Sequence, residues 1–132
     1  SKTKRFVAFI PFAPLDDPFE IMLASKGHTS NFAQQLGDRE SSLEFARLLQ
    51  DVVRRVKKVL QKDILGKDWE KALDPPHQCR LYTAPYHEED GTFHWHLVVR
   101  FYTTKNGGHE EGTKEKIIPI SPEEVAQILG KD

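Results

Sequence analysis

The sequence predicts an α+β domain in which one long helix packs on one face of an antiparallel sheet and the other face stays open. Four runs rich in β-branched and aromatic residues surround a long segment whose apolar residues recur every three or four positions. The last two runs follow each other across a short polar segment, as the strands of a hairpin do. The expected order is therefore two strands, the long helix, two strands and a short helix.

The first two strands are separated by a loop that contains several prolines. The run 5–10 is β-branched and aromatic, and the prolines between positions 11 and 18 exclude a helix after it. Residues 19–23 alternate, with apolar side chains at the odd positions, which is typical of a half-buried strand. Residues 26–28 are expected to close this second strand.

The long helix is expected to begin at Ser41, because Ser41 and Glu44 match the Ser-x-x-Glu pattern of a capping box. Leu65 followed by Gly66 supplies a stop signal. The apolar stripe that should face the sheet consists of Phe45, Ala46, Leu49, Val52, Val53, Val56, Val59 and Leu60. The basic residues fall mostly off this stripe, and we interpret them as a solvated outer face rather than a phosphate site.

The second half of the chain supplies a hairpin and a final helix. Residues 78–84 and 93–103 are expected to be strands, joined by an acidic turn at 85–92. The segment 104–116 is polar and without a period, and we interpret it as a loop. Ser121 as N-cap, Pro122 at the first helical position and Glu124 at the third predict a helix that stops at Gly130.

The composition fits a single domain of 132 residues and excludes several functional classes. The 19 basic and 20 acidic residues give a formal charge of −1, which argues against binding to nucleic acid or to an anionic membrane. Cys79 is the only cysteine, so the chain can form neither an intrachain disulfide nor a zinc site built on a cysteine pair. Neither a signal peptide nor a membrane span is expected. These features predict a cytoplasmic protein.

The strand expected at 93–103 carries the candidate chemistry, because side chains on a strand alternate between its two faces. The core face should carry Phe93, Trp95, Leu97, Val99 and Phe101, and the opposite face His94, His96, Val98, Arg100 and Tyr102. Two imidazoles two residues apart can share a metal or a phosphate, one of them as nucleophile, and Arg100 suits an anion. A solvent-facing edge strand would show the same pattern. The neighbouring motif at 83–85 and the glycine-rich loop with Glu110 favour a binding site.

Short motifs occur in order along the chain, at residues 6–13, 18–20, 26–28, 83–85, 94–97, 108–113 and 121–124. This ordered set resembles the C-terminal half of galactose-1-phosphate uridylyltransferases. That family belongs to the histidine-triad superfamily, and its chains carry two related domains, each an antiparallel sheet with a helix. The resemblance implies that residues 1–132 are one histidine-triad-like domain, the C-terminal half of a longer two-domain enzyme.

The resemblance also implies nucleotidyl transfer, in which UMP passes from a UDP-hexose to a histidine and then to a hexose 1-phosphate. The family's nucleophile lies in a His-Pro-His motif of the N-terminal half, which is absent here, so this chain alone is expected to be inactive. We expect four substrate-binding residues: His94, His96 and Arg100, from the pattern of the strand, and Glu110, from the resemblance. Glu110 lies in a loop that resembles the segment closing over the hexose.

Some relatives hold a structural metal through histidines at positions that match Tyr82, Val98 and Arg100. None of these three residues is a histidine here and Arg100 would repel a cation, so we expect no metal in this chain and assign any zinc to the N-terminal half. We expect a homodimer or pairing with an N-terminal half-domain through the sheet. Two other functions remain open. One is a small histidine-triad hydrolase acting through His96, against which the missing histidine at Val98 counts. The other is a non-catalytic module that binds a nucleotide or a sugar phosphate.

Overall fold

The computed structural model describes residues 1–14, 17–60, 76–85, 93–102, 112–113, 118 and 120–130. The predicted order of elements is confirmed, with one short helix, α1, added before the long one. The elements are β1 (Phe6–Phe9), β2 (Glu20–Ser25), α1 (Phe32–Gln35), α2 (Arg39–Leu60), β3 (His77–Tyr82), β4 (His96–Phe101) and α4 (Pro122–Gly130).

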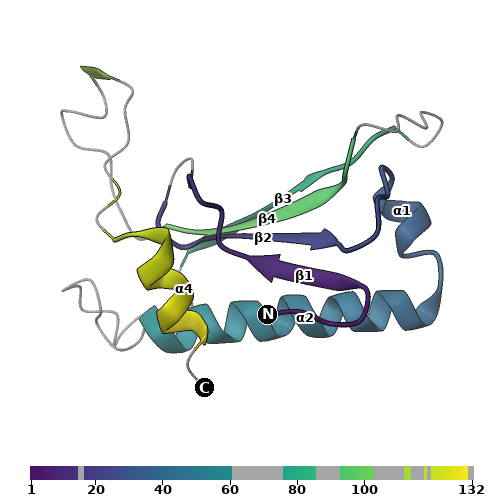
Figure 1. Cartoon of the computed structure of the whole chain (residues 1–132), viewed down its shortest axis with the longest axis horizontal. Helices are drawn as coiled ribbons and strands as arrows, with labels where there is room; N and C mark the ends of the chain where they lie inside the picture. Colours follow the sequence, from purple (N-terminus) through teal and green to yellow (C-terminus); the bar gives the residue numbers. More distant parts are fainter. Residues whose placement is uncertain are drawn as a thin grey trace.

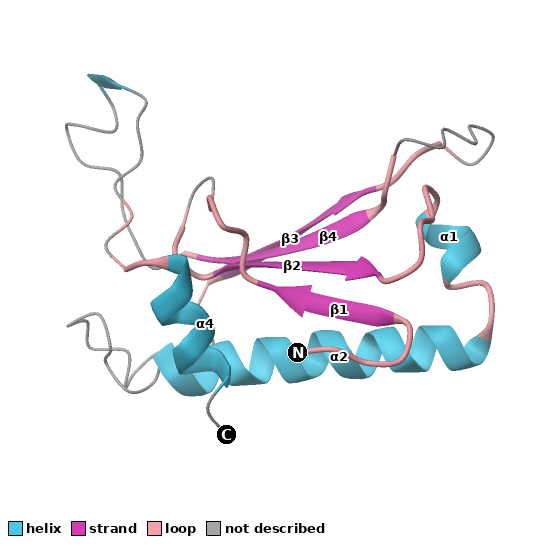
Figure 2. Ribbon diagram, viewed as in Figure 1, coloured by secondary structure: helices cyan, strands magenta, loops and turns pink. Residues whose placement is uncertain are grey.

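The four strands form one antiparallel sheet in the order β1-β2-β4-β3. The hairpin predicted between β3 and β4 is confirmed, and β4 pairs with β2 on its other side, so β4 is an interior strand of the sheet. Helix α2 runs along one face of the sheet (Figures 1 and 2), and α4 packs against α2 near its C-terminal end. The α+β class is therefore confirmed. None of the described helices is long and apolar enough to cross a membrane.

The hydrophobic core lies between the sheet and α2. The residues expected on the core face of β4 are buried there, as Trp95, Leu97, Val99 and Phe101 all belong to the core cluster. Trp95 is fully buried, and its ring lies 4.9 Å from Phe32, 5.6 Å from Phe45 and 6.1 Å from Phe6, measured between centroids. The contacts with Phe32 and Phe45 are edge-on, an arrangement that aromatic rings prefer, and the contact with Phe6 is tilted.

The start of α2 differs from the prediction. The helix begins at Arg39, and the Asp38 carboxylate accepts a hydrogen bond from the Ser41 backbone N–H at 2.8 Å, so Asp38 fills the role expected of Ser41. Ser41 is buried inside the first turn. The predicted capping box is therefore wrong. The Asp38 carboxylate, three residues upstream, accepts the hydrogen bond from the Ser41 N–H that Glu44 was expected to accept, and the Glu44 carboxylate instead binds Arg5.

The buried stripe of α2 also differs from the prediction. It consists of Ser41, Phe45, Leu48, Val52, Val56 and Leu60. Leu48 was missed, and Ala46, which we placed in the stripe, is exposed. Positions 45, 48, 52 and 56 lie on one face of a helix with 3.6 residues per turn, whereas the side chain of residue 46 points about 100° away from that of residue 45. The predicted stop at residues 65–66 lies outside the described residues.

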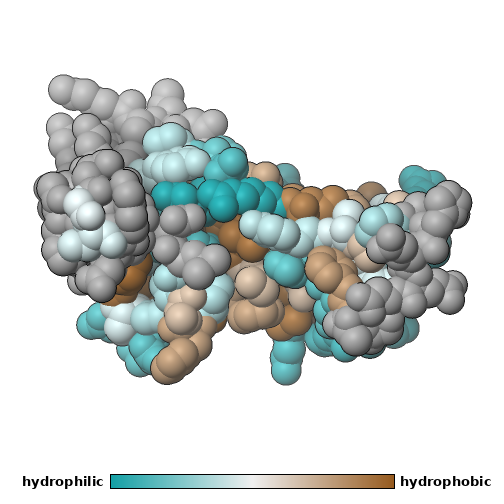
Figure 3. All heavy atoms as spheres, turned by 90° about the horizontal axis from the view of Figure 1, so that it is seen from above, coloured by the Kyte–Doolittle hydropathy of each residue, from teal (hydrophilic) through white to brown (hydrophobic). Residues whose placement is uncertain are grey.

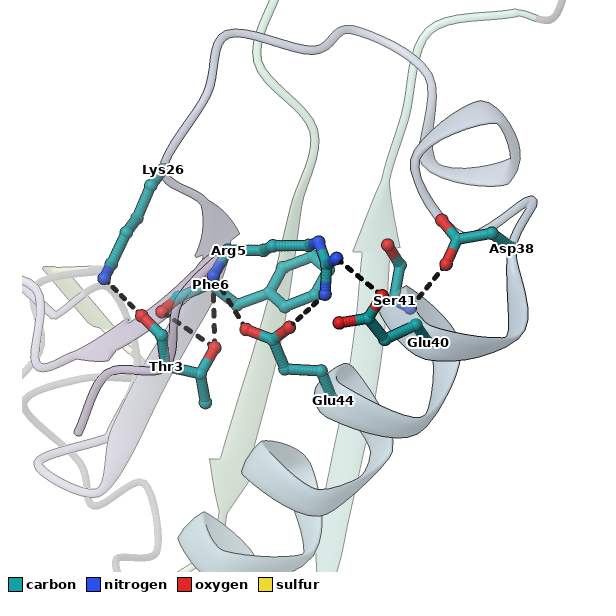
Figure 4. A network of polar contacts seen from close by, with 8 residues as sticks. All are labelled: Thr3, Arg5, Phe6, Lys26, Asp38, Glu40, Ser41 and Glu44. Carbon is teal, nitrogen blue, oxygen red and sulfur yellow. Dashed lines mark hydrogen bonds and ion pairs between the residues drawn. The ribbon is translucent and has the colours of Figure 1, made fainter.

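A polar network ties β1 to α2 (Figure 4). Arg5 donates from its backbone N–H and from Nη1 to the Glu44 carboxylate, at 2.7 and 2.6 Å, and its Nη2 lies 3.0 Å from Glu40. On the other side, the Lys26 ammonium donates to the Thr3 carbonyl. Hydrogen bonds from the Thr3 hydroxyl and from Arg5 lower the pKa of Glu44 to about 2. Glu44 thus serves as a tether between sheet and helix.

The capping box predicted for the last helix is confirmed. The Ser121 hydroxyl accepts a hydrogen bond from the Glu124 N–H at 3.2 Å, and the Glu124 carboxylate accepts one from the Ser121 N–H at 3.1 Å. At the other end of α4, Arg55 of α2 donates to the Leu129 carbonyl at 3.1 Å. Both ends of α4 are therefore fixed, and α4 ends at Gly130 as expected.

Candidate functional site

The candidate site lies on the sheet face that α2 leaves uncovered, which we call the open face (Figure 3). Residues paired across antiparallel strands point to the same side of a sheet, so the register defines three rows. The first row is Tyr82, His96, Ala24 and Val7; the second is Arg80, Val98, Met22 and Phe9; the third is Gln78, Arg100 and Glu20. Hydrophilic and hydrophobic side chains thus lie next to one another over the sheet.

His96 is the half-buried imidazole of the first row. Its Nδ1 lies 3.2 Å from the carbonyl oxygen of His94. Because a carbonyl oxygen only accepts, Nδ1 carries the proton, and in the neutral ring Nε2 then has the lone pair. The Tyr82 ring stacks on the imidazole at 4.7 Å with an interplanar angle of 16°. His96 is therefore held in one tautomer with Nε2 as its second polar atom.

His94 adopts the opposite arrangement at the end of β2. Its Nε2 lies 2.9 Å from both the carbonyl and the hydroxyl oxygen of Ser25, so Nε2 carries the proton. The Ser25 hydroxyl in turn donates to the Gly27 carbonyl at 2.6 Å. The ring of His28 meets His94 edge-on at 5.5 Å. His94 thus fastens the start of β4 to the end of β2, and its carbonyl fixes the ring of His96.

The motif at 83–85, which favoured a binding site in the sequence, has a structural role. The Ala84 N–H donates to the Ser30 carbonyl at 3.0 Å, and the Asn31 side chain donates to the Ala84 carbonyl at 3.2 Å. The Thr83 hydroxyl accepts from the Phe32 N–H at the start of α1. These contacts hold the β2–α1 connection against the end of β3.

The other end of the open face carries a second polar group. The Tyr102 hydroxyl donates to Gln78 Oε1 at 2.8 Å, and Arg80 Nε donates to the same oxygen at 3.2 Å. The Arg100 guanidinium lies over the Tyr102 ring, 4.6 Å from its centroid. Sequence reasoning named Arg100 but missed Gln78 and Arg80. The alternation of β3, read from the predicted hairpin, could have placed both on the same face.

The structure therefore separates the predicted site residues. His96 and Arg100 share the open face, four residues apart on β4, whereas the side chain of His94 is tied to Ser25. Glu110 lies outside the described residues. No described group of three or more His, Cys, Asp or Glu residues could hold a metal ion.

The three positions matched to a structural metal in some relatives do not fit a cation. Tyr82 stacks on His96, and Val98 is an apolar side chain that is mostly buried. Arg100 carries a positive charge and cannot act as a ligand.

Comparison with known proteins supports the resemblance in the sequence motifs. No protein-family model matches the chain. It is 28% identical over 131 residues to the ADP-glucose phosphorylase of Arabidopsis thaliana, which covers 97% of this chain and 33% of that protein. It is 27% identical over 136 residues to the galactose-1-phosphate uridylyltransferase of Thermotoga maritima, which covers 97% of this chain and 38% of the relative.

The fold gives the same result. The crystal structure of the Arabidopsis thaliana ADP-glucose phosphorylase with bound ADP-glucose matches 99% of this chain and 39% of its own, with a TM-score of 0.75 and 26% identity. The chain thus spans between a third and two-fifths of the length of these relatives. It is homologous to the galactose-1-phosphate uridylyltransferase and ADP-glucose phosphorylase family, over one histidine-triad-like domain.

Proposed function

We propose that residues 1–132 form the C-terminal, substrate-completing domain of a sugar-1-phosphate nucleotidyltransferase. Its substrates would be a UDP-hexose, or a related nucleotide sugar, and a hexose 1-phosphate. Support comes from the relatives, an ADP-glucose phosphorylase and a galactose-1-phosphate uridylyltransferase, and from the ADP-glucose bound in the crystal structure of the first. The chain corresponds to only part of those proteins, so the remaining part of the active site belongs to a second domain.

The observation that carries this proposal is the fixed tautomer of His96. With Nδ1 bound to the His94 carbonyl, Nε2 is the atom that a phosphate group can meet on the open face. Protonated, the imidazole donates a hydrogen bond to a phosphate oxygen and stabilises its charge. Because the ring is already held in place, ligand binding costs little side-chain conformational entropy at His96.

The attack on phosphorus is assigned to the other domain, because the His-Pro-His motif of the family is absent here. A histidine nucleophile splits the transfer into two displacements, and the donors around it hold the phosphate charge in both. In this proposal the other domain carries the nucleophile, and His96 and Arg80 of this domain help to bind the ligand. The isolated chain should give no uridylyl exchange between UDP-glucose and galactose 1-phosphate.

The test is a titration of the full chain with UDP-glucose and with ADP-glucose, followed by ¹H–¹⁵N NMR. We expect saturable chemical-shift changes for residues of β3 and β4. His96→Gln should bind about tenfold more weakly, because one charge-assisted hydrogen bond is lost. Gln50→Leu, an exposed substitution on α2, serves as the control and should not change the affinity. Absence of saturable shifts on the sheet would overturn the proposal.

The same tautomer favours a second function, a small histidine-triad hydrolase. His96 Nε2 would attack the phosphorus of a nucleotide and expel the group esterified to that phosphate, and water would then break the bond between nitrogen and phosphorus to release the nucleoside monophosphate. In that case a nucleoside monophosphate would be trapped on His96, and turnover would disappear with His96→Ala. The third function, a binding module without catalysis, predicts nucleotide binding and no turnover even when the second domain is added. Turnover by the isolated chain would indicate the hydrolase. Turnover only after the second domain is added would indicate the transferase, and binding without turnover in either case would indicate the binding module.

We also propose that the domain pairs through β3, either with a second copy or with the other half-domain. β3 is an outer strand of the described sheet, and its side chains are mostly exposed. Such an edge offers backbone N–H and C=O groups to another strand. Sedimentation across a concentration series should show a dimer, and a chain that stays monomeric at high concentration would contradict self-pairing.

A further inference from the structure

The carbonyl group of His94 sets the tautomer of His96, but it has no ladder partner on β3 in the described sheet. The last pair between β3 and β4 joins Tyr82 to His96. The same register, continued by two residues, would pair His94 with Ala84. The N–H and C=O groups of Ala84 bind the β2–α1 connection instead. The position of the His94 carbonyl therefore depends on how residues 94 and 95 are anchored outside the ladder.

Two contacts anchor the peptide group between residues 94 and 95, to which this carbonyl belongs. On one side, Trp95 is fully buried, and its backbone N–H donates to the Thr29 carbonyl at 3.1 Å. On the other side, His94 Nε2 donates to the carbonyl and hydroxyl oxygens of Ser25, both at 2.9 Å. Rotation of the peptide group would disturb both contacts. Ser25 thus supplies one of the two anchors of the carbonyl that His96 needs.

The Ser25 hydroxyl is itself held in one orientation. Ser25 is only 3% exposed, and its hydroxyl donates its proton to the Gly27 carbonyl at 2.6 Å. The hydroxyl oxygen therefore acts as an acceptor toward His94 Nε2, beside the carbonyl oxygen of the same residue. With alanine at position 25, Nε2 would keep one acceptor in place of two, and the His94 ring would be held less tightly.

Resting on the function proposed above, we infer that Ser25 is a positioning residue for the phosphate contact of His96. Its hydroxyl holds the His94 ring, and the His94 carbonyl holds Nδ1 of His96. Nε2 of His96 is thereby directed to a phosphate oxygen on the open face. Ser25 is buried and contacts no ligand, so its substitution should lower the affinity for phosphate through the orientation of His96 alone.

The experiment compares Ser25→Ala with Ser25→Thr, which keeps the hydroxyl, and with Gly27→Ala in the same turn. A Cβ at Gly27 would meet no atom of the described residues within 4 Å, so Gly27→Ala is a matched control that removes no acceptor. Long-range ¹H–¹⁵N NMR of the free chain should show a mixture of His96 tautomers in Ser25→Ala and the Nδ1–H form in the other proteins. Calorimetric titration with UDP-glucose and with UDP should show about threefold weaker binding of both ligands for Ser25→Ala only.

The tautomer measurement needs no ligand, so it separates this inference from the function on which it rests. If Ser25→Ala melts at a lower temperature but keeps the wild-type tautomer of His96, Ser25 stabilises the fold and positions nothing. The inference is also wrong if Ser25→Thr behaves like Ser25→Ala, or if Gly27→Ala loses as much affinity. If the wild type binds neither UDP-glucose nor UDP, the proposed function is wrong, and the tautomers alone decide whether Ser25 orients His96.

Discussion

The two faces of the sheet use the same strands for different purposes. On the covered face, Trp95, directly before β4, and Phe101, at the end of β4, are both fully buried. On the open face, their sequence neighbours His96 and Arg100 are half-buried. The alternation of a single strand thus gives a rigid apolar support for polar side chains on the opposite side.

The covered face holds the hydrophobic core and should determine stability, whereas under the proposed function the open face should determine ligand binding. Substitutions under α2 should lower the free energy of unfolding with large effects, because they leave cavities in a packed core. Substitutions on the open face should leave stability nearly unchanged and alter ligand affinity.

Trp95→Ala should be the most destabilising of these changes. The ring is fully buried among Phe6, Phe32 and Phe45, and its removal should cost about 3–5 kcal/mol, a large part of the stability of a domain this size. Tyr82→Ala on the open face, where the ring is 41% exposed, should cost less than about 1 kcal/mol. Urea denaturation measures both, and equal losses would contradict the division between the faces.

The sequence predicted the covered face well, because burial leaves a periodic signal. The alternation from Trp95 to Phe101 and the three- and four-residue spacing of α2 are both visible without a structure. The start of α2 was not predictable from its motif alone. Ser41–Glu44 matches a capping box, yet Asp38 makes the cap and Arg5, far away in the sequence, takes Glu44. Asp38 is a local cap that the choice of Ser41 overlooked, whereas a tertiary partner such as Arg5 leaves no local pattern.

The open face was predicted only in part. His96 and Arg100 followed from alternation along one strand. Alternation also puts Gln78 and Arg80 on one face of β3, but whether they share the face of His96 depends on the register between the two strands, which the sequence does not state. The different roles of His94 and His96 depend on which carbonyl each ring meets. Hydrogen-bond partners of this kind are set by backbone geometry, not by residue type.

The second prediction concerns the tautomers of His94 and His96, two residues apart in the sequence. At a pH where both rings are neutral, His96 should carry its proton on Nδ1 and His94 on Nε2, because each donates to a carbonyl oxygen. Long-range ¹H–¹⁵N NMR distinguishes the two forms directly. The same tautomer in both rings would remove the basis for assigning different roles to them.

The third prediction concerns α4, whose Val125 belongs to the core of the covered side. Ser121→Ala removes the hydroxyl that accepts from the Glu124 N–H and should cost about 1 kcal/mol. Ser121→Asp restores an acceptor at the same position and should recover the loss. Thermal denaturation compares the three proteins. A Ser121→Asp variant as unstable as Ser121→Ala would show that the cap does not contribute.

The fourth prediction, and the smallest effect, concerns the polar tether between β1 and α2. The folded-state pKa of Glu44, lowered to about 2 from the ordinary 4.5, means that its stabilising effect is fully present above pH 4.5 and is lost as the pH falls toward 2. Glu44→Gln should therefore be less stable than the wild type at pH 6 and closer to it at pH 2.5.

Glu40→Gln is the matched control, because Glu40 also contacts Arg5 but its side chain is 75% exposed. Exposed ion pairs contribute little and are screened by salt, so this variant should follow the wild-type pH dependence closely. The lowered pKa values of Asp38 and Asp51 act in the same direction in all three proteins and cancel in the comparison. A constant difference between Glu44→Gln and the wild type from pH 6 to 2.5 would show that Glu44 contributes through packing rather than through its charge.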